Sequence, residues 1–318
     1  MATPADTVST YDAIGNREDL SNIIYDISPT STPFISGISH VPATAVNHEW
    51  QTDTLGNATA SNATIEGNDA STTAPIPTVR LGNRTQISSK VPRVTRTQRQ
   101  IDSAGRGDEM SLQIMKNSKL LKNDMESAML ANKAKVTGST TLARELAGVE
   151  SWLATNFNGG VGAVAPTGDG TDVNTPGTNR AFAESDLKSV LASCWDQGGE
   201  PDTIMVGSTV KQALSGIVNG GSAGAAQRVV DGNAATVHTA IDIYVSDFGS
   251  LAVVPNRFMV QTSLLVLQMD MFAMASVTDF EETPLAKTGD SDRVQILSEY
   301  TLEARNQKSS GIMTALTS

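Results

Sequence analysis

The sequence contains a single cysteine, Cys194, and only three histidines. One cysteine can form neither an internal disulfide nor a thiolate metal cluster. His40, His48 and His238 are scattered, and none has a second histidine at the spacing of a metal-binding motif. No cofactor and no metal site is therefore predicted.

Long apolar runs and aromatic residues are also scarce. The most apolar stretch, Ser263 to Ala275, carries Gln268 and Asp270. It is shorter than the roughly 18 residues of a membrane span, so we expect a buried strand there and no membrane partner. The polar first residues predict no signal peptide. Because aromatic residues make up only 4% of the chain, the sequence predicts a lean core and many polar loops.

Motifs of catalysis are equally scarce. The sequence contains no Gly-rich loop ending in Gly-Lys-Ser/Thr and no dinucleotide fingerprint. Gly220-Gly221-Ser222-Ala223-Gly224 matches the pattern of a nucleophile elbow. That turn requires a strand before the serine and a helix after it, whereas here a predicted helix precedes and Gly-rich sequence follows. We therefore expect no enzymatic activity.

Charge is distributed unevenly along a chain whose net charge is −11. Residues 1–180 carry 15 Lys and Arg against 18 Asp and Glu, whereas residues 181–318 carry 8 against 16. Such acidity excludes a general nucleic-acid binder, which needs a basic face to displace counterions. One segment is strongly basic, with a single acidic residue, Asp102, among its seven cations: Arg80, Arg84, Lys90, Arg93, Arg96, Arg99 and Arg106. A solvated strand face, the acidic half of another copy, and nucleic acid are three interpretations of this segment.

The longest helical pattern runs over residues 108–136. Asp108 is placed to cap the first turn, and Glu109 adds negative charge at its positive end. Apolar residues then recur at steps of three, four and seven up to Thr137-Gly138. A helix of this length would measure roughly 40 Å. It is either a long core helix or a spine that links two ends of an elongated subunit.

A polar segment precedes this helix. Residues 55–78 are almost wholly Asn, Ala, Thr, Ser and Gly, and predicted strands flank them from Val46 and up to Gln100. Two strands of about 23 residues would reach at most about 75 Å, far beyond a compact domain. An isolated ribbon is marginally stable in water, so such an arm would lie on another subunit. The alternative is a disordered surface loop.

Other elements are predicted more briefly. Short amphipathic helices are expected at Arg17–Ile27 and Thr141–Leu153, and an extended piece at Thr30–Ile35. Farther along, helices at Glu184–Trp195 and Ser208–Val218 enclose a buried strand at Thr203–Gly207. Further strands are expected near 236–245, 251–254, 263–275 and 293–303, after a flexible tip at 220–226. Because helices and strands come in blocks, the expected fold class is α+β.

This order of elements resembles the major capsid proteins of tailed double-stranded DNA bacteriophages, which have the Hong Kong 97-type capsid fold. The segments Tyr11–Leu20, Ile27–Phe34 and Arg144–Leu153 are similar to one family of these proteins. The resemblance implies an N-terminal arm (1–45), an extended β-hairpin loop (46–98), a peripheral domain (99–142) with the spine helix 108–136, an axial domain (143–255), and a return to the peripheral domain (256–318).

The resemblance also implies a function. It is self-assembly into hexamers and pentamers of an icosahedral head that encloses double-stranded DNA, which touches the inner surface non-specifically. The partners would be other copies, a portal protein and separate scaffolding or decoration proteins, and assembly would occur in the host bacterial cytoplasm. The alternatives are an encapsulin-like nanocompartment shell protein and a fibre or adhesin-type structural protein. The candidate inter-subunit contacts are Arg80, Arg84, Lys90, Arg93, Arg96, Arg99, Phe34, Ile35 and Trp50.

Overall fold

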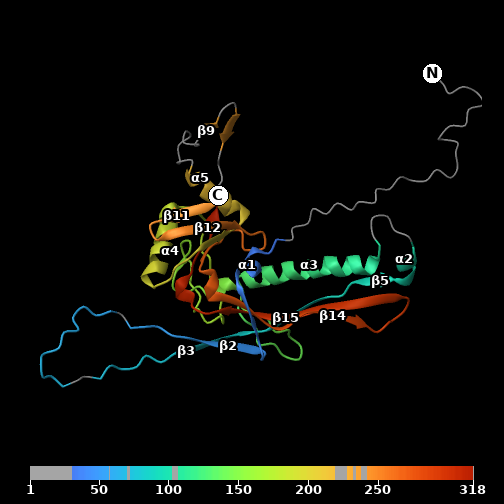
Figure 1. The fold of residues 1–318 in the computed structure, drawn as a ribbon, viewed down its shortest axis with the longest axis horizontal. Helices are drawn as coiled ribbons and strands as arrows, with labels where there is room; N and C mark the ends of the chain where they lie inside the picture. The colour runs from blue at the N-terminus through green and yellow to red at the C-terminus, as the bar shows by residue number, and fades with distance from the viewer. Residues whose placement is uncertain are drawn as a thin grey trace, which may run out of the picture.

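A computed structural model describes residues 31–317 apart from 57, 70–71, 102–106, 219–227, 232–233 and 238–241. Its strands form a five-stranded sheet, a six-stranded sheet and three two-stranded ribbons, one of which projects from one side (Figure 1). The buried apolar side chains form two cores. The first core, which includes Phe272 and Leu265, contains residues of both larger sheets, and the second core consists largely of residues of the six-stranded sheet and of the helices on it. The mixture of helices and strands agrees with the predicted α+β class. The predicted helix Arg17–Ile27 and the predicted tip 220–226 lie outside the described residues.

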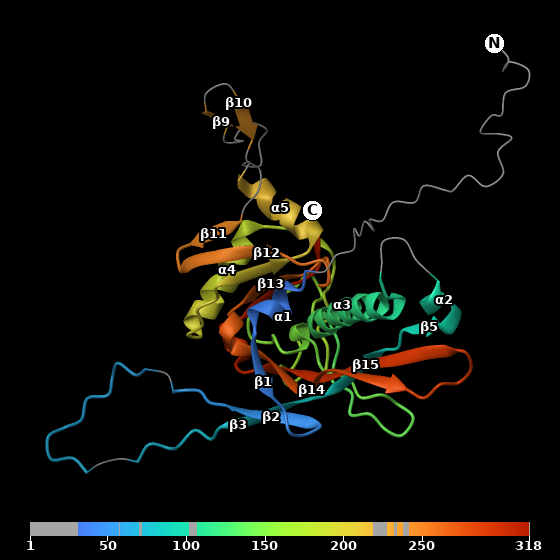
Figure 2. The same ribbon diagram turned by 45° about the vertical axis from the view of Figure 1, so that its right-hand side comes forward.

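The first sheet has five strands and supports the longest helix. Its order is β1 (Ser39–Pro42), β14 (Phe272–Leu285), β15 (Ser291–Ala304) and β4 (Gln86–Lys90), while β5 (Arg93–Thr95) pairs with the other end of β15. The long antiparallel hairpin β14–β15 forms its centre, and β1 runs parallel to β14. Helix α3 (Glu109–Leu130) lies along this sheet, and the short α2 (Arg96–Gln100) precedes it (Figure 2).

Helix α3 begins where the sequence predicts and ends early. The Asp108 carboxylate accepts a hydrogen bond from the Ser111 backbone N–H at 3.0 Å, as expected of a cap. The helix has 22 residues, about 33 Å, so the predicted end at residue 136 is wrong. Beyond it the backbone forms sheet-like hydrogen bonds instead, from Gly148 N–H to the Lys133 carbonyl and from Lys135 N–H to the Gly170 carbonyl.

The second sheet has six strands. The order is β11 (Ile243–Ser246), β12 (Gly249–Pro255), β8 (Thr203–Val206), β13 (Leu264–Leu267), β16 (Gly311–Met313) and β6 (Phe157–Asn158). Helices α4 (Glu184–Asp196) and α5 (Ser208–Val218) pack on it, which confirms the predicted helix–strand–helix unit. Two small ribbons lie outside the larger sheets: β9 (Arg228–Asp231) pairs with β10 (Ala234–Val237), and β7 (Arg180–Ala181) pairs with β17 (Leu316–Thr317).

Three local predictions are corrected. Residues 263–275 are two strands, β13 and β14, separated by the 3₁₀ turn η2 (Met269–Met271), so they are no single strand. Residues 141–153 form no α-helix: Glu145 pairs with Val136, and only the 3₁₀ turn η1 (Val149–Ser151) follows. The expected extended piece before residue 36 contains the short helix α1 (Pro33–Gly37), because Pro33 is suited to a first helical position.

The projecting ribbon is shorter than predicted. Strands β2 (Asn47–Thr52) and β3 (Val79–Arg84) pair over six residues each, from Asn47 with Arg84 to Thr52 with Val79. The described residues of the segment 53–78 extend beyond them without pairing and reach far from both sheets (Figure 1). Residues 86–95 belong to the five-stranded sheet, so much of the basic segment lies on the body.

Candidate assembly surface

A buried asparagine anchors the ribbon to the body. Asn83 on β3 is 0% exposed, and its Nδ2 donates to the Leu302 carbonyl at 2.8 Å and to the Ala147 carbonyl at 3.2 Å. Its Oδ1 accepts from the Ala147 N–H at 2.9 Å. A buried amide that satisfies three partners holds its strand in one position. The base of the ribbon is therefore fixed against β15 and the segment before η1.

Aromatic and cationic side chains reinforce this base. The Trp50 ring on β2 packs against the Trp152 ring, with centroids 5.2 Å apart. Lys135 Nζ lies 5.7 Å from the Trp152 ring centroid and donates to the Gly82 carbonyl at 2.7 Å and the Asp169 carbonyl at 2.8 Å. Burial lowers the pKa of Lys135. These contacts place both strands of the ribbon on one side of the first core.

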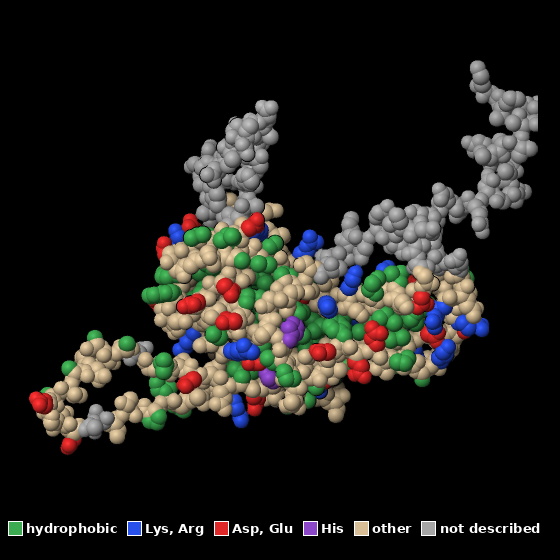
Figure 3. Space-filling model, viewed as in Figure 1, with side chains coloured by type: hydrophobic (Ala, Val, Ile, Leu, Met, Phe, Trp, Pro, Cys, Tyr) green, Lys and Arg blue, Asp and Glu red, His purple; other side chains and the backbone are tan. Residues whose placement is uncertain are grey.

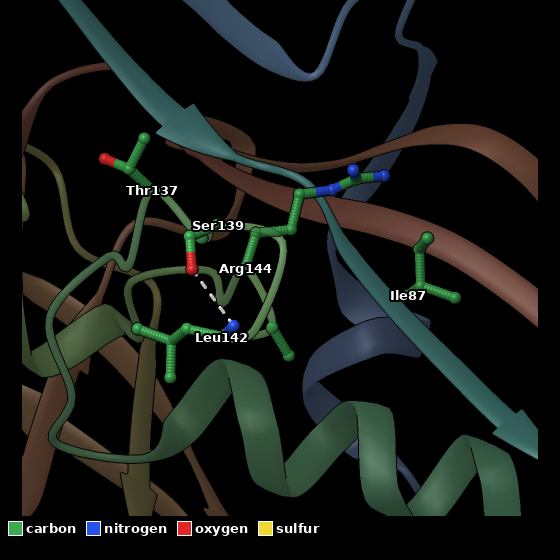
Figure 4. Close-up of a pocket in the computed structure, with 7 residues that line it drawn as sticks. Ile87, Thr137, Ser139, Leu142 and Arg144 are labelled. Atoms are coloured by element: carbon green, nitrogen blue, oxygen red, sulfur yellow. Dashed lines mark hydrogen bonds between the residues drawn. The ribbon is translucent and has the colours of Figure 1, made fainter.

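A shallow cavity lies beside this base. It has a volume of about 260 Å³, and exposed apolar side chains of Ile87 and Leu142 form part of its wall. Figure 4 shows the Arg144 side chain extending away from Ser139 and Leu142. Its guanidinium instead donates to the Thr85 carbonyl at 3.0 Å and pairs with Glu299 at 2.5 Å. The arrangement offers apolar contact area rather than reactive groups.

The described part of the loop beyond the ribbon has no covering from its own chain. Leu55 is 97% exposed, Ile65 82% and Ile76 53%. Every charged residue between 53 and 78 is acidic, namely Asp53, Glu66 and Asp69. Exposed large apolar side chains on a projecting segment are typical of a surface that another protein covers. The loop is therefore the strongest candidate for contact with a partner.

Many cations of the basic segment form ion pairs or hydrogen bonds within their own chain. Lys90 pairs with Asp124 at 2.6 Å and Arg99 with Asp292 at 2.6 Å. The remaining polar contacts are Arg80 with Glu49 at 3.7 Å, Arg96 with Asp290 at 3.0 Å, Arg99 with Asp108 at 3.7 Å, and Arg93 Nε with Ser291 Oγ at 2.7 Å. Among the described residues, Arg84 is the one candidate cation of the six whose side chain contacts no carboxylate or hydroxyl group, although its backbone carbonyl accepts from Thr301 Oγ1 at 2.8 Å. Arg106 lies outside the described residues. The acidic second half thus supplies Asp290 and Asp292 to its own chain.

The three apolar candidates lie in the chain's own first core. Phe34 is 0% exposed and packs edge-on against Phe272, with ring centroids 6.0 Å apart. Trp50 is 9% exposed, and Ile35 packs on the same core while half-buried. Burial within the subunit already uses Phe34, Trp50 and part of Ile35, so the loop and the exposed cations are the stronger candidates, and a role of these three residues between subunits stays a prediction.

Sequence reasoning missed the buried carboxylate of Glu126 on α3. Its two oxygens accept from the backbone N–H groups of Phe34 at 2.8 Å and Ile35 at 2.9 Å, and from Asn256 Nδ2 at 2.7 Å. Burial raises the pKa of Glu126. The available signal was its spacing, three and four residues before the buried Met129 and Leu130. Glu126 joins α1, α3 and the end of β12.

No reactive constellation stands out among the residues that the structure describes. No group of three His, Cys, Asp or Glu side chains in those ranges could hold a metal ion. Burial raises the pKa of Cys194 to about 12, so its thiol is protonated at neutral pH. No helix in the described ranges is long and apolar enough to cross a membrane.

Comparison with known proteins identifies the fold. The model of the SU10 major capsid protein family matches residues 6–317. The major capsid protein of Escherichia phage Phieco32 is 26% identical over 98% of this chain and 97% of its own length. A chain of the cyanophage A-1(L) capsid has a TM-score of 0.67 and 13% identity over 98% of this chain and 99% of its own. A chain of the capsid of the native GTA particle has a TM-score of 0.61 and 13% identity over 96% of this chain and 97% of its own.

These findings confirm the resemblance and the Hong Kong 97-type fold that the sequence analysis inferred. They favour neither the nanocompartment nor the fibre alternative.

Proposed function

Because this chain belongs to the SU10 major capsid protein family, we propose that its copies assemble into hexamers and pentamers of an icosahedral phage head. The chain is a structural protein of a phage capsid and hence a component of the virion. The observation that supports this mode of assembly is the loop 53–78. Its base is rigid, whereas its apolar side chains have no contact with the body that would bury them.

Each loop would lie across a neighbouring copy in the shell. A fixed base aims the loop in one direction, which lowers the entropy lost on docking. Repeated around a ring, such head-to-tail contacts close on themselves, and many modest contacts sum to a stable shell. Arg80, which is mostly exposed, and Arg84, which lacks a carboxylate partner within the described chain, extend the contact along β3.

We propose a division into domains that follows the two larger sheets. The six-stranded sheet with α4 and α5 forms the axial domain that clusters at the symmetry axes, and the five-stranded sheet with α3 forms the peripheral domain. Residues 256–318 contribute β13 and β16 to the first of these and β14 and β15 to the second. The boundary therefore follows the sheets rather than a single cut at residue 255.

The remaining partners follow from a role as a phage shell. We propose that the head encloses double-stranded DNA, that it contacts a portal protein, and that scaffolding or decoration proteins act as separate chains. Assembly would take place in the host bacterial cytoplasm. An enzymatic role is not part of this proposal, because the shell function needs only association.

The test is assembly of a loop variant, L55S/I65S/I76S, in which three exposed apolar side chains become polar. The matched control, V161S/V164S/V173S, changes three exposed valines on a loop of the body. We expect the control to form closed shells in negative-stain electron microscopy and the loop variant to remain as soluble subunits or open rings. Closed shells from both in equal yield would contradict the proposed role of the loop.

The same particles test the contents of the shell. Shells produced together with the neighbouring phage genes are expected to copurify with double-stranded DNA. Closed particles that hold a single cargo protein and no DNA would support a nanocompartment instead. Rod-shaped particles would support the fibre alternative.

A further inference from the structure

Three lysines form a charged row on the exposed side of α3. Lys116, Lys119 and Lys122 are all exposed, and they follow one another at steps of three residues. Within the described chain, neither Lys116 nor Lys119 has a carboxylate partner. Met115 and Leu120 are 50% and 49% exposed beside them. We call this surface, made of these five residues, the α3 lysine face.

The α3 lysine face has an unusual charge for this chain. The protein is acidic overall, and the carboxylates nearest in sequence on α3 are already engaged: Asp124 pairs with Lys90, and Glu126 is buried. Figure 3 shows blue side chains along the upper edge of the region that α3 occupies in Figure 1. Positive side chains interspersed with apolar ones favour an occupant that is both acidic and apolar.

A cavity of about 290 Å³ continues this face toward the N-terminal end of the described chain. Lys122 and Met125 of α3 line it together with Thr32, Ile35 and Phe280; His40 and Asp279 lie in the same wall. The Phe280 ring is 38% exposed, and Lys122 Nζ lies 5.6 Å from its centroid. The cavity therefore combines an apolar floor with a cation at its edge.

The chain that leads into this cavity has the matching composition. Residues 1–31 carry five acidic residues and one basic residue, and apolar positions alternate with them in the predicted helix Arg17–Ile27. Because Thr32 lines the cavity, the preceding residues start beside it. Asp26 lies six residues before Thr32, so an extended chain covers at most about 20 Å between them. The lysine row itself spans only about 9 Å of helix, which is within that reach.

We propose that the α3 lysine face and its cavity are the docking site of the N-terminal segment 1–31 of the same chain. The carboxylates of Glu18, Asp19 and Asp26 would meet the three lysines, while Leu20, Ile23 and their neighbours would cover Met115, Leu120 and Phe280. This places the segment on its own subunit. The proposal deepens the capsid function, on which it rests.

The experiment measures hydrogen exchange of backbone amides in residues 17–27 of the full-length, unassembled chain by mass spectrometry. The test variant is K116E/K119E/K122E, and the matched control is K116R/K119R/K122R, which keeps the charge at the same positions. We expect about tenfold faster exchange in the Glu variant, since three exposed ion pairs are lost together, and unchanged exchange in the Arg variant. A second variant, E18K/D19K/D26K, is expected to show the same acceleration. The chain that carries both sets of substitutions is expected to regain the protection of residues 17–27.

Two outcomes would overturn the proposal. Equal exchange of residues 17–27 in the wild type and in the Glu variant would show that the three lysines do not bind the N-terminal segment. Protection that appears only in assembled shells, or that is lost on dilution, would assign the docked segment to a neighbouring copy. The hydrogen-exchange experiment uses unassembled protein as its reference. Its result can therefore be interpreted even if the loop experiment shows no role for the loop in shell formation. Equal thermal unfolding midpoints of the variants confirm that the Glu substitutions have not unfolded α3.

Discussion

Replacing Glu126 by alanine should detach α1 from the spine helix. The carboxylate is the acceptor for three donors, the N–H groups of Phe34 and Ile35 and the Asn256 amide. Each buried donor left without an acceptor costs roughly 1–3 kcal/mol, and the three costs overlap because the groups share one site. We therefore expect the free energy of unfolding to fall by about 3–5 kcal/mol, the range found when one partner of a buried charged network is removed.

The more conservative change Glu126→Gln separates shape from acceptor capacity. An amide keeps one oxygen for the Phe34 N–H and the Asn256 amide but presents an NH₂ group where the second carboxylate oxygen accepts from the Ile35 N–H. Its expected cost is about 1–2 kcal/mol, one unsatisfied donor. The matched control is Ser127→Ala on the exposed side of the same turn, which should change the unfolding free energy by no more than about 0.5 kcal/mol.

The assays are urea unfolding of the unassembled subunit and hydrogen exchange at the Phe34 and Ile35 amides. Loss of the acceptor should accelerate exchange at both amides before any global change. Burial of Phe34 depends on the same tie, so its ring packing against Phe272 should loosen as well. An alanine variant as stable as the Ser127→Ala control, with both amides still protected, would refute the idea that Glu126 holds α1 in place.

Two further predictions concern other buried polar groups. Asn83→Ala should lower the free energy of unfolding by about 2–4 kcal/mol, because it removes the amide that satisfies the Ala147 N–H and two carbonyls. Thermal unfolding measures this loss, with Asn68→Ala at an exposed position as the control. Burial raises the pKa of Glu150 above its ordinary 4.5. Between pH 4.5 and the raised pKa, the folded state therefore binds more protons than the unfolded state. The free energy of unfolding falls as the pH rises through this range. The difference in unfolding free energy should therefore move in favour of Glu150→Gln from pH 4.5 upward, and a constant difference between pH 4 and about 8 would exclude this titration.

The parts of the fold that the sequence predicts well are those decided by neighbours in the chain. The start of α3 depends on Asp108 and the N–H of Ser111, three residues apart. Helix α4 and strand β8 follow from apolar spacing and from Gly198-Gly199 between them. Such local signals remain visible in a single sequence because both partners lie within one turn.

The end of α3 shows why other element boundaries cannot be predicted from the sequence. The pattern of apolar residues continues past Leu130, yet the backbone leaves the helix to bond with residues that lie far along the chain. Gly148 packs so closely on Ala131 that an added Cβ would lie 1.9 Å from the Ala131 carbonyl oxygen. Tertiary hydrogen bonds from Lys133 and Lys135 outweigh local helix propensity here, and no period in the sequence announces them.

The basic segment illustrates the same limit for the candidate site. A run of cations beside an acidic second half predicts attraction between the two, and that attraction is present: Arg99 reaches Asp292 across 193 residues of sequence. What the charge pattern leaves open is whether the partner lies in the same chain or in the next. Only the hairpin β14–β15, which brings Asp290 and Asp292 beside α2, decides the question for Arg96 and Arg99.

This pairing changes how assembly must be tested. Reversing Arg93, Arg96 and Arg99 to Glu would break contacts that hold the subunit itself together, so a loss of shells could reflect misfolding. Arg84, which is half-buried on β3 and has no carboxylate partner in the described chain, is the cation whose reversal leaves these ion pairs intact. The loop 53–78 is better still, because every residue of it that the structure describes is exposed. We propose that the polar network at the base of the ribbon fixes its direction and that the apolar side chains beyond it make the contact between copies.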